Sequence, residues 1–322
     1  MAPRVAFIGL GRMGLSCIGP SADQVRFQGI TENLLRYGDI AKPLVLYNRT
    51  TEKAHEQSLR LGDCDLAESI PAAVAAADII WLCLQDQAAV TETFDLIFPL
   101  DIRGKLFVDS STVTPAKTNA IAQRVCEAGA EFVAAPVMGG PPMAVTRSLI
   151  CIASGTAEAV DRIRPYLHGV ICRKVVDLSG EQPGRALLLK LMGNFLIMAT
   201  IETVAEAHVF AEQSGIGTGN MNKLMSAMFP EPPHALYNGQ MLSGEYCSGR
   251  PMVEVSKAIT LVDEVLDLAH ACGAAVPIYE TARQHLQDAK DHAGPDTDIT
   301  GIYGAVRLAS GLPFSNQPEE DI

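Results

Sequence analysis

The chain has 322 residues, a length that suits two domains better than one. Hydrophobic residues make up 48% and charged residues 19% of it, which excludes a disordered protein. The formal net charge is -12 and no run of lysine or arginine offsets it, so the composition argues against binding to nucleic acid or to an anionic membrane.

Short apolar runs alternate with helical patterns through the first 180 residues. This alternation predicts an α/β fold with a doubly wound, mostly parallel sheet of the Rossmann type and helices on both faces. The helical patterns include 51–61 and 115–128. The expected strands lie at 5–8, 44–47, 79–82, 106–108, 132–134, 149–152 and 174–178.

The pattern changes near Gly180 and Pro183, which punctuate the chain. Beyond them the strand-like runs disappear, and helical patterns follow at 184–214, 252–272 and 277–292. We therefore expect a Rossmann-type α/β domain at 1–180 and an all-α domain at 181–322.

The segment 186–201 is apolar enough to raise the question of a membrane span. It is short for a span and contains Lys190 and Asn194, and a charge there is costly in lipid. A helix buried inside protein is the better interpretation, and we expect no membrane association.

A glycine-rich turn follows the first predicted strand, with the spacing G-x-G-x-x-G. In this position the glycines permit a tight turn and a close approach of the backbone to a pyrophosphate, which then faces a helix N-terminus. The alternative is a glycine-rich turn without a ligand. The predicted cofactor-binding residues of this turn are Gly9, Leu10, Gly11, Arg12, Met13 and Gly14.

The second predicted strand ends in Asn48, Arg49 and Thr50, with no carboxylate. An acidic residue here binds the ribose 2′-hydroxyl of NAD, whereas an arginine pairs with the 2′-phosphate of NADP. We therefore expect these three residues to bind NADP. The alternative is that Arg49 is a solvated residue at the start of a helix.

The segment 15–30 departs from the usual dinucleotide-binding pattern, because Pro20 falls where a helix is expected to follow the glycine turn. An insertion separates Gly14 from the helical run 31–36.

Four further motifs occur in a fixed order along the chain. They are D-S-S-T-V-T-P at 109–115, P-V-M-G-G-P-P at 136–142, K-L-M-G-N at 190–194, and Lys257 near the start of a C-terminal helix. Together they resemble the β-hydroxyacid dehydrogenase family, which includes 3-hydroxyisobutyrate dehydrogenase and glyoxylate/succinic semialdehyde reductase. The resemblance covers roughly residues 4–290.

The resemblance implies that Lys190 is the proton donor and acceptor and that Asn194 assists it. Both residues are expected on one face of a helix, within an apolar stretch. Burial lowers the pKa of a lysine toward the range useful for acid–base catalysis. The alternative is a lysine that extends from a helix face into water.

The family pattern also assigns substrate-binding residues. Ser111 and Thr112 follow a strand at the edge where α/β sheets bind ligands, and Thr114 before Pro115 is a good helix cap. Ser111 resembles the residue that binds the substrate carboxylate, and Gly139 and Gly140 resemble a backbone nest for the same group.

Three other assignments follow from the resemblance. Leu84 and Gln85 lie in a loop that is expected to contact the cofactor. Lys257 resembles a family lysine near the cofactor, although the aspartate that usually follows this lysine is replaced by Ala258. A solvated helix lysine is the alternative for Lys257. Arg250 stands where the family commonly places a pocket aromatic, and we list it as a substrate-binding candidate.

These features predict an NADP-dependent oxidoreductase that transfers a hydride between the nicotinamide and a small β-hydroxy acid or semialdehyde. The alternatives are an imine reductase-like enzyme and a non-catalytic NADP-binding protein on the same scaffold. 6-Phosphogluconate dehydrogenase has a related NADP-binding domain, but its helical part is much longer. The resemblance also implies a homodimer.

The cysteines are dispersed and form no C-x-x-C pair, which favours a reducing compartment. The first predicted strand begins almost at residue 1 and leaves no room for a signal peptide before it. We therefore expect a cytoplasmic protein. The histidines His208, His234 and His270 have no partner at metal-ligand spacing, so we expect no metal site.

Overall fold

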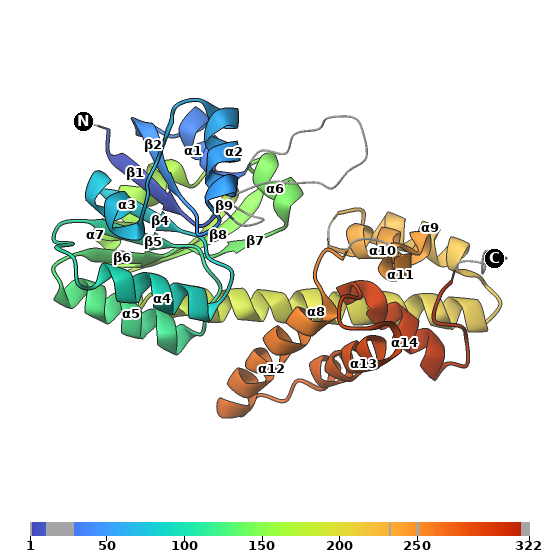
Figure 1. Ribbon diagram of the computed structural model, residues 1–322. Coiled ribbons are helices and arrows are strands. Elements are labelled where there is room, and N and C mark those ends of the chain that lie inside the picture. The colour runs from blue at the N-terminus through green and yellow to red at the C-terminus, as the bar shows by residue number, and fades with distance from the viewer. Residues whose placement is uncertain (1, 11–28, 232, 249–250, 317–322) are drawn as a thin grey trace. The chain divides into compact units, whose positions relative to one another are not determined.

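The computed structural model describes residues 2–10, 29–231, 233–248 and 251–316 (Figure 1). The chain forms two compact units, Met1–Lys190 and Leu191–Ile322. The long helix α8 (Gly184–Gln213) gives its first residues to the first unit and the remainder to the second.

The first unit is built on a sheet in which the described residues form nine strands. The order is β3-β2-β1-β4-β5-β6-β8-β7, with β9 also paired to β8, and only the β6–β8 and β7–β8 pairs are antiparallel. The prediction of a doubly wound, mostly parallel sheet is confirmed. The strands are β1 (Arg4–Ile8), β2 (Ala41–Tyr47), β3 (Cys64–Leu66), β4 (Ile79–Leu82), β5 (Leu106–Asp109), β6 (Glu131–Ala134), β7 (Val137–Met138), β8 (Leu149–Gly155) and β9 (Cys172–Ser179).

Helices cover both faces of this sheet, because alternate residues of a strand point to opposite faces. Val5 and Phe7 of β1 pack with α1 and α7, whereas Ala6 and Ile8 pack with α3, α4 and α5. Continuous apolar runs are what a strand buried on both faces requires. The helices of this unit are α1 (Ile30–Tyr37), α2 (Thr51–Leu61), α3 (Ile70–Ala76), α4 (Gln87–Ile97), α5 (Pro115–Glu127), α6 (Pro141–Val145) and α7 (Ala157–Ile163).

Two short strands were not predicted from the sequence. The β3 strand has three residues with Asp65 at its centre, and β7 has only two residues. Neither is long enough to show an apolar pattern, so both depend on pairing with β2 and β8.

The second unit is helical, as predicted. Its core includes Val204, Tyr279 and Tyr303, and all three are buried. Helix α12 begins three residues later than expected, because Asp298 accepts hydrogen bonds from the N–H groups of Met252 and Val253 and keeps that stretch outside the helix. Besides α8, the helices are α9 (Thr218–Met228), α10 (His234–Ser243), α11 (Glu245–Ser248), α12 (Val255–Ala271), α13 (Pro277–Ala293) and α14 (Ile302–Ala309).

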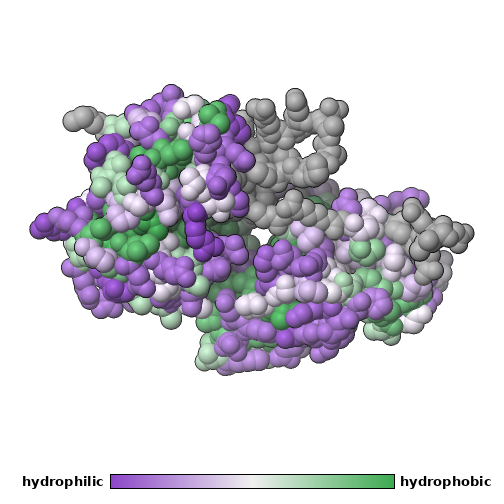
Figure 2. Space-filling model, in the orientation of Figure 1, coloured by the Kyte–Doolittle hydropathy of each residue, from purple (hydrophilic) through white to green (hydrophobic). Residues whose placement is uncertain are grey.

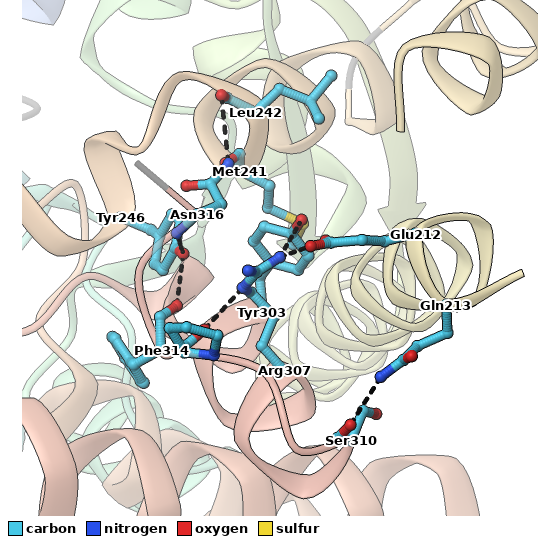
Figure 3. Close-up of polar contacts among 11 residues, drawn as sticks. Glu212, Gln213, Met241, Leu242, Tyr246, Tyr303, Arg307, Ser310, Phe314 and Asn316 are labelled. Atoms are coloured by element: carbon cyan, nitrogen blue, oxygen red, sulfur yellow. Dashed lines mark hydrogen bonds and ion pairs between the residues drawn. The ribbon is translucent and has the colours of Figure 1, made fainter. Parts of the chain in front are cut away.

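Hydrogen bonds and an ion pair hold the segment after α14 against the rest of the second unit (Figure 3). The buried guanidinium of Arg307 pairs with Glu212 at the end of α8 and donates to the Pro313 carbonyl at 2.8 Å. The Tyr246 hydroxyl donates to the Phe314 carbonyl at 2.6 Å. The Phe314 ring lies against Gly304, where an added Cβ would come within 2.4 Å of it, so the close approach requires glycine.

Helix α8 is long and apolar enough to cross a membrane by length and composition alone, and a third of its most apolar window is buried. We expected this helix to be buried inside protein, and in the single chain it is only partly buried. Met192, Leu196 and Phe210 are exposed to 53%, 64% and 72%. By contrast, the visible surface along α12 and α13 is mostly hydrophilic (Figure 2).

Candidate functional site

The carboxyl ends of the parallel strands meet at one edge of the sheet. From β1 the strands β2 and β3 extend the sheet to one side, whereas β4, β5 and β6 extend it to the other. The strand order therefore reverses between β1 and β4, and ligands of open α/β sheets bind at such a reversal. Gly9 follows β1 with a φ of 98°, and an added Cβ would lie 2.4 Å from the carbonyl oxygen of Cys83 after β4. The two loops therefore approach each other closely enough to require glycine, as a dinucleotide cradle does.

The loop after β2 lies beside the glycine turn. The Asn48 side-chain oxygen accepts a hydrogen bond from the Leu10 N–H at 2.9 Å, and its amide donates to the Thr50 carbonyl at 2.8 Å. Asn48 thus connects two of the predicted cofactor loops. Arg49 and Thr50 are exposed, and no carboxylate pairs with Arg49 in the described parts of the chain. Gly11, Arg12, Met13 and Gly14, and most of the 15–30 insertion, lie outside the described residues.

The loops after β4 and β5 are joined by a side chain. The Leu84 N–H donates to the Ser111 hydroxyl oxygen at 2.9 Å, and Ser111 is 2% exposed. Gln85 is exposed beside it. Thr112 is half-buried, and its hydroxyl has no partner among the described residues. The predicted cofactor loop and the predicted substrate loop are therefore in direct contact.

Lys190 lies at the same edge of the sheet. Its Nζ donates a hydrogen bond to the Val137 carbonyl at 2.5 Å. Burial lowers the pKa of this amine to about 8, against the opposing influence of the Cys83 and Cys151 thiols that face it. The residue as a whole is half-buried, and this hydrogen bond directs its amine toward the end of β7.

The position of Lys190 follows from how α8 begins. Gly184 packs against the first turn of α5, where an added Cβ would lie 2.5 Å from the Pro115 carbonyl oxygen. The Gly184 N–H donates to the Asn119 side chain at 2.8 Å. This close contact anchors the first turn of α8 and brings Lys190, less than two turns later, to the strand ends.

Gly139 and Gly140 come two and three residues after Val137, the residue whose carbonyl accepts from Lys190. The φ of Gly139 is 117°, and an added Cβ would lie 2.7 Å from the Met143 sulfur, so this turn requires glycine. Within the described residues, neither glycine N–H has a hydrogen-bond partner. Two free donors therefore remain at this turn, as the predicted carboxylate nest requires.

The remaining candidates belong to the second unit. Asn194 is half-buried one turn beyond Lys190 on α8. Lys257 is 61% exposed and pairs with Glu254 of the same helix start at 2.6 Å, so the solvated alternative describes it well in this structure. Arg250 lies outside the described residues.

Asp109, the first residue of the D-S-S-T-V-T-P motif, was not predicted to have a role. It is 3% exposed and accepts a hydrogen bond from the Ser111 N–H at 2.9 Å. The signal available in the sequence was an ionisable residue at the end of an apolar strand. No group of three or more His, Cys, Asp or Glu residues that would hold a metal ion occurs in the part of the chain that the structure describes.

Comparisons with known proteins show similarity to nicotinamide-dependent oxidoreductases. Residues 28–177 match the family model of the NAD-binding domain of 6-phosphogluconate dehydrogenase. An NADH-dependent oxidoreductase, ucdB, from Aspergillus ustus is 64% identical over 290 residues, covering 90% of this chain and 99% of the relative.

Two solved structures show how widely the fold is shared. A 3-hydroxyisobutyrate dehydrogenase from Salmonella typhimurium is 22% identical with a TM-score of 0.77, covering 93% of this chain and 98% of that chain. A reductive aminase from Aspergillus terreus is 20% identical with a TM-score of 0.56, covering 95% and 100%. At these identities the likeness establishes the fold alone.

Proposed function

The chain belongs to the β-hydroxyacid dehydrogenase family of nicotinamide-dependent oxidoreductases, and on that premise we propose that it interconverts a small hydroxy acid and the corresponding semialdehyde or keto acid, with Lys190 as general acid and base.

The observation that supports this proposal most strongly is the environment of the Lys190 amine. A buried ammonium with a pKa of about 8 is present in both protonation states near neutral pH. In the direction of reduction Lys190 protonates the developing alkoxide, and in the direction of oxidation it removes the hydroxyl proton. When bound, the nicotinamide supplies or accepts the hydride.

We assign the substrate carboxylate to hydrogen-bond donors at the same edge of the sheet as the amine. The Ser111 hydroxyl and the free N–H groups of Gly139 and Gly140 lie on the loops after β5 and β7. Such donors bind a carboxylate and hold the neighbouring carbonyl carbon in a fixed orientation, which accounts for much of the rate gain in reactions of this type. Thr112, with its unpartnered hydroxyl, is a further donor for the same group.

The cofactor that the strand ends fit best is NADP(H). Two observations support this preference. Gly9 forms the tight turn after the first strand that is typical of dinucleotide sites, and the exposed Arg49 guanidinium follows β2, the position from which an arginine can bind a 2′-phosphate. The name of the A. ustus relative points instead to NADH. Because β2 ends without a carboxylate to bind the 2′-hydroxyl, we assign the preference to NADP(H).

We further propose a homodimer formed through α8. The exposed apolar side chains of Met192, Leu196 and Phe210 follow helical spacing along one face of this helix. Exposed apolar stripes of this kind mark protein interfaces in soluble proteins.

The cysteines that the structure describes are free thiols, which fits the cytoplasmic location that we propose. The partners of the protein in this account are a small-molecule substrate and a second copy of the chain, with neither nucleic acid nor a membrane.

The experiment that tests the proposal measures NADPH and NADH oxidation with glyoxylate, succinic semialdehyde, small 2-keto acids, uncharged aldehydes and cyclic imines. We expect turnover of the carboxylate-bearing carbonyl compounds, preferentially with NADPH. Activity confined to cyclic imines would favour the imine reductase alternative. Tight NADPH binding without turnover of any compound would favour the non-catalytic alternative.

A further inference from the structure

The start of α8 needs a hydrogen-bond acceptor that the neighbouring chain does not supply. Helix α8 begins at Gly184, and the residue before it is Pro183. The first N–H groups of a helix have no acceptor within the helix, and the side chain just before the helix commonly provides one. The side chain of Pro183 has no acceptor atom, so a side-chain cap for α8 has to come from another part of the chain.

Asn119 of α5 supplies this cap. Its Oδ1 accepts a hydrogen bond from the Gly184 N–H at 2.8 Å, and its amide donates to the Gln182 side chain at 3.5 Å. The segment before α8 is also fixed by Ser154 near the end of β8, whose hydroxyl donates to the Gln182 carbonyl at 2.9 Å. Side chains of α5 and β8 therefore hold the first turn of the helix that carries Lys190.

Helix α5 also follows the loop that we assign to the substrate. It begins at Pro115 and is capped by Thr114, whose hydroxyl accepts from the Lys117 N–H at 3.3 Å. Ser111 lies just before this cap, and Asn119 lies one turn after Pro115. A single helix thus connects the proposed carboxylate-binding loop with the start of α8.

The distance from the cap to the reacting amine is short. Lys190 follows Gly184 by six residues, which is about 9 Å along the helix axis. With fewer than two turns between them, a shift of the first turn is carried to the lysine, whose Nζ donates to the Val137 carbonyl at 2.5 Å. Misplacement of a reacting group by about 1 Å can lower a rate by about 10²-fold.

We propose that Asn119 is a positioning residue, whose side-chain oxygen caps α8 and thereby sets the place of the Lys190 amine relative to the substrate loop. The proposal rests on the function proposed above. It assigns the effect to the acceptor oxygen, because the contact that fixes Gly184 is made by this atom.

Three substitutions test the role of this oxygen. Asn119→Ala removes it from a half-buried position of α5, and alanine suits the helix. Asn119→Asp keeps an acceptor oxygen at the same place, beside a helix N-terminus that favours negative charge. Ser69→Ala is the matched control, because it removes the cap of another helix, α3, where the Ser69 hydroxyl accepts from the Ala72 N–H at 3.2 Å.

The experiment measures single-turnover NADPH oxidation with succinic semialdehyde between pH 6 and 10. For Asn119→Ala we expect the rate at neutral pH to fall about tenfold or more, with the dissociation constant of NADPH within about threefold of wild type. We also expect the pH midpoint of the rate to rise above about 8, because a displaced amine is better hydrated.

The other two variants separate positioning from stability. Asn119→Asp should keep both the rate and the pH midpoint close to wild type. Ser69→Ala should lower the melting temperature to an extent similar to Asn119→Ala and leave the rate and the midpoint unchanged.

Several results would overturn the proposal. If Asn119→Ala keeps the wild-type rate and midpoint while Lys190→Met is inactive, this inference fails and the proposed function stands. Loss of rate in Asn119→Asp equal to that in Asn119→Ala would exclude an effect of the acceptor oxygen, and equal loss in Ser69→Ala would reduce it to stability. If Asn119→Ala does not fold, Asn119→Lys decides, since lysine offers donors alone: a wild-type rate in that folded protein contradicts the proposal. If Lys190→Met keeps the wild-type rate, the proposed function has failed and this inference falls with it.

Discussion

The Lys190 ammonium donates a hydrogen bond to the Val137 carbonyl oxygen at 2.5 Å, two residues before the Gly139–Gly140 turn. One contact therefore places a buried amine next to two free backbone donors at the carboxyl edge of a parallel sheet. Burial lowers the pKa of this amine to about 8, and the neighbouring Cys83 and Cys151 oppose that effect only in part.

The pH dependence of turnover follows from that environment. Reduction needs protonated Lys190, so kcat for reduction should be highest below pH 8 and fall as the pH rises through about 8. Oxidation needs the neutral amine and should rise through the same pH. Measurement of kcat for reduction and for oxidation between pH 6 and 10 tests this prediction. If both rates rise, or both fall, as the pH passes through about 8, the prediction is contradicted.

Replacement of the Ser111 hydroxyl should weaken binding of the substrate carboxylate. Ser111→Ala removes a hydrogen bond to a charged group, and we expect KM for carboxylate-bearing substrates to rise about tenfold or more. Ser110→Ala tests the specificity of the effect, because that hydroxyl is fully used by Trp81 and Ala135. Equal increases of KM in the two variants would remove the assignment of Ser111.

The choice of cofactor should depend on Arg49. Arg49→Ala removes the cation proposed to bind the 2′-phosphate, so the dissociation constant of NADPH should rise about 10-fold to 100-fold, while that of NADH changes little. Fluorescence titration with both cofactors measures this directly. Lys42→Ala, at the opposite end of β2 and paired with Asp63, is the control. If the affinities for NADH and NADPH fall equally, Arg49 does not bind the 2′-phosphate.

The oligomeric state tests the exposed face of α8. Light scattering after size-exclusion chromatography should give wild type a mass twice that of the chain. The double variant Leu196→Glu and Phe210→Glu should shift toward the monomer, because association would then bury two added charges. Leu59→Glu is the control, since Leu59 is 74% exposed on α2. A monomeric wild type with full activity would contradict the proposed dimer.

Much of this architecture was predictable from local sequence patterns. Several elements appear where the sequence predicts them, because their signals lie in neighbouring residues. They are the strands β1, β4 and β5 and the helix start at Thr114 and Pro115. The position of Lys190 within a leucine-rich helix also predicts, from the sequence alone, that its amine is at least partly buried.

The rest depends on contacts between residues far apart in the chain. The two-residue strand β7 exists only through pairing with β8, yet it supplies the Val137 carbonyl that holds Lys190. Likewise, Ser110 points into the sheet and Ser111 toward Leu84, and the spacing of the two serines in the sequence does not reveal this difference.

The central claim is that Lys190 exchanges a proton with the substrate, and Lys190→Met tests it most directly. The lowered pKa means that the unfolded chain binds more protons than the folded one between about pH 8 and 10.5, so wild-type stability rises with pH across that window. Replacing the buried amine with an apolar group of similar length should therefore stabilise the protein at neutral pH, by on the order of 1–3 kcal/mol.

The decisive measurement is single-turnover NADPH oxidation by folded, cofactor-saturated Lys190→Met protein. We expect a rate lower than wild type by about 10²-fold or more, in a variant that is at least as thermally stable and binds NADPH as tightly. A wild-type rate in that variant would contradict the account.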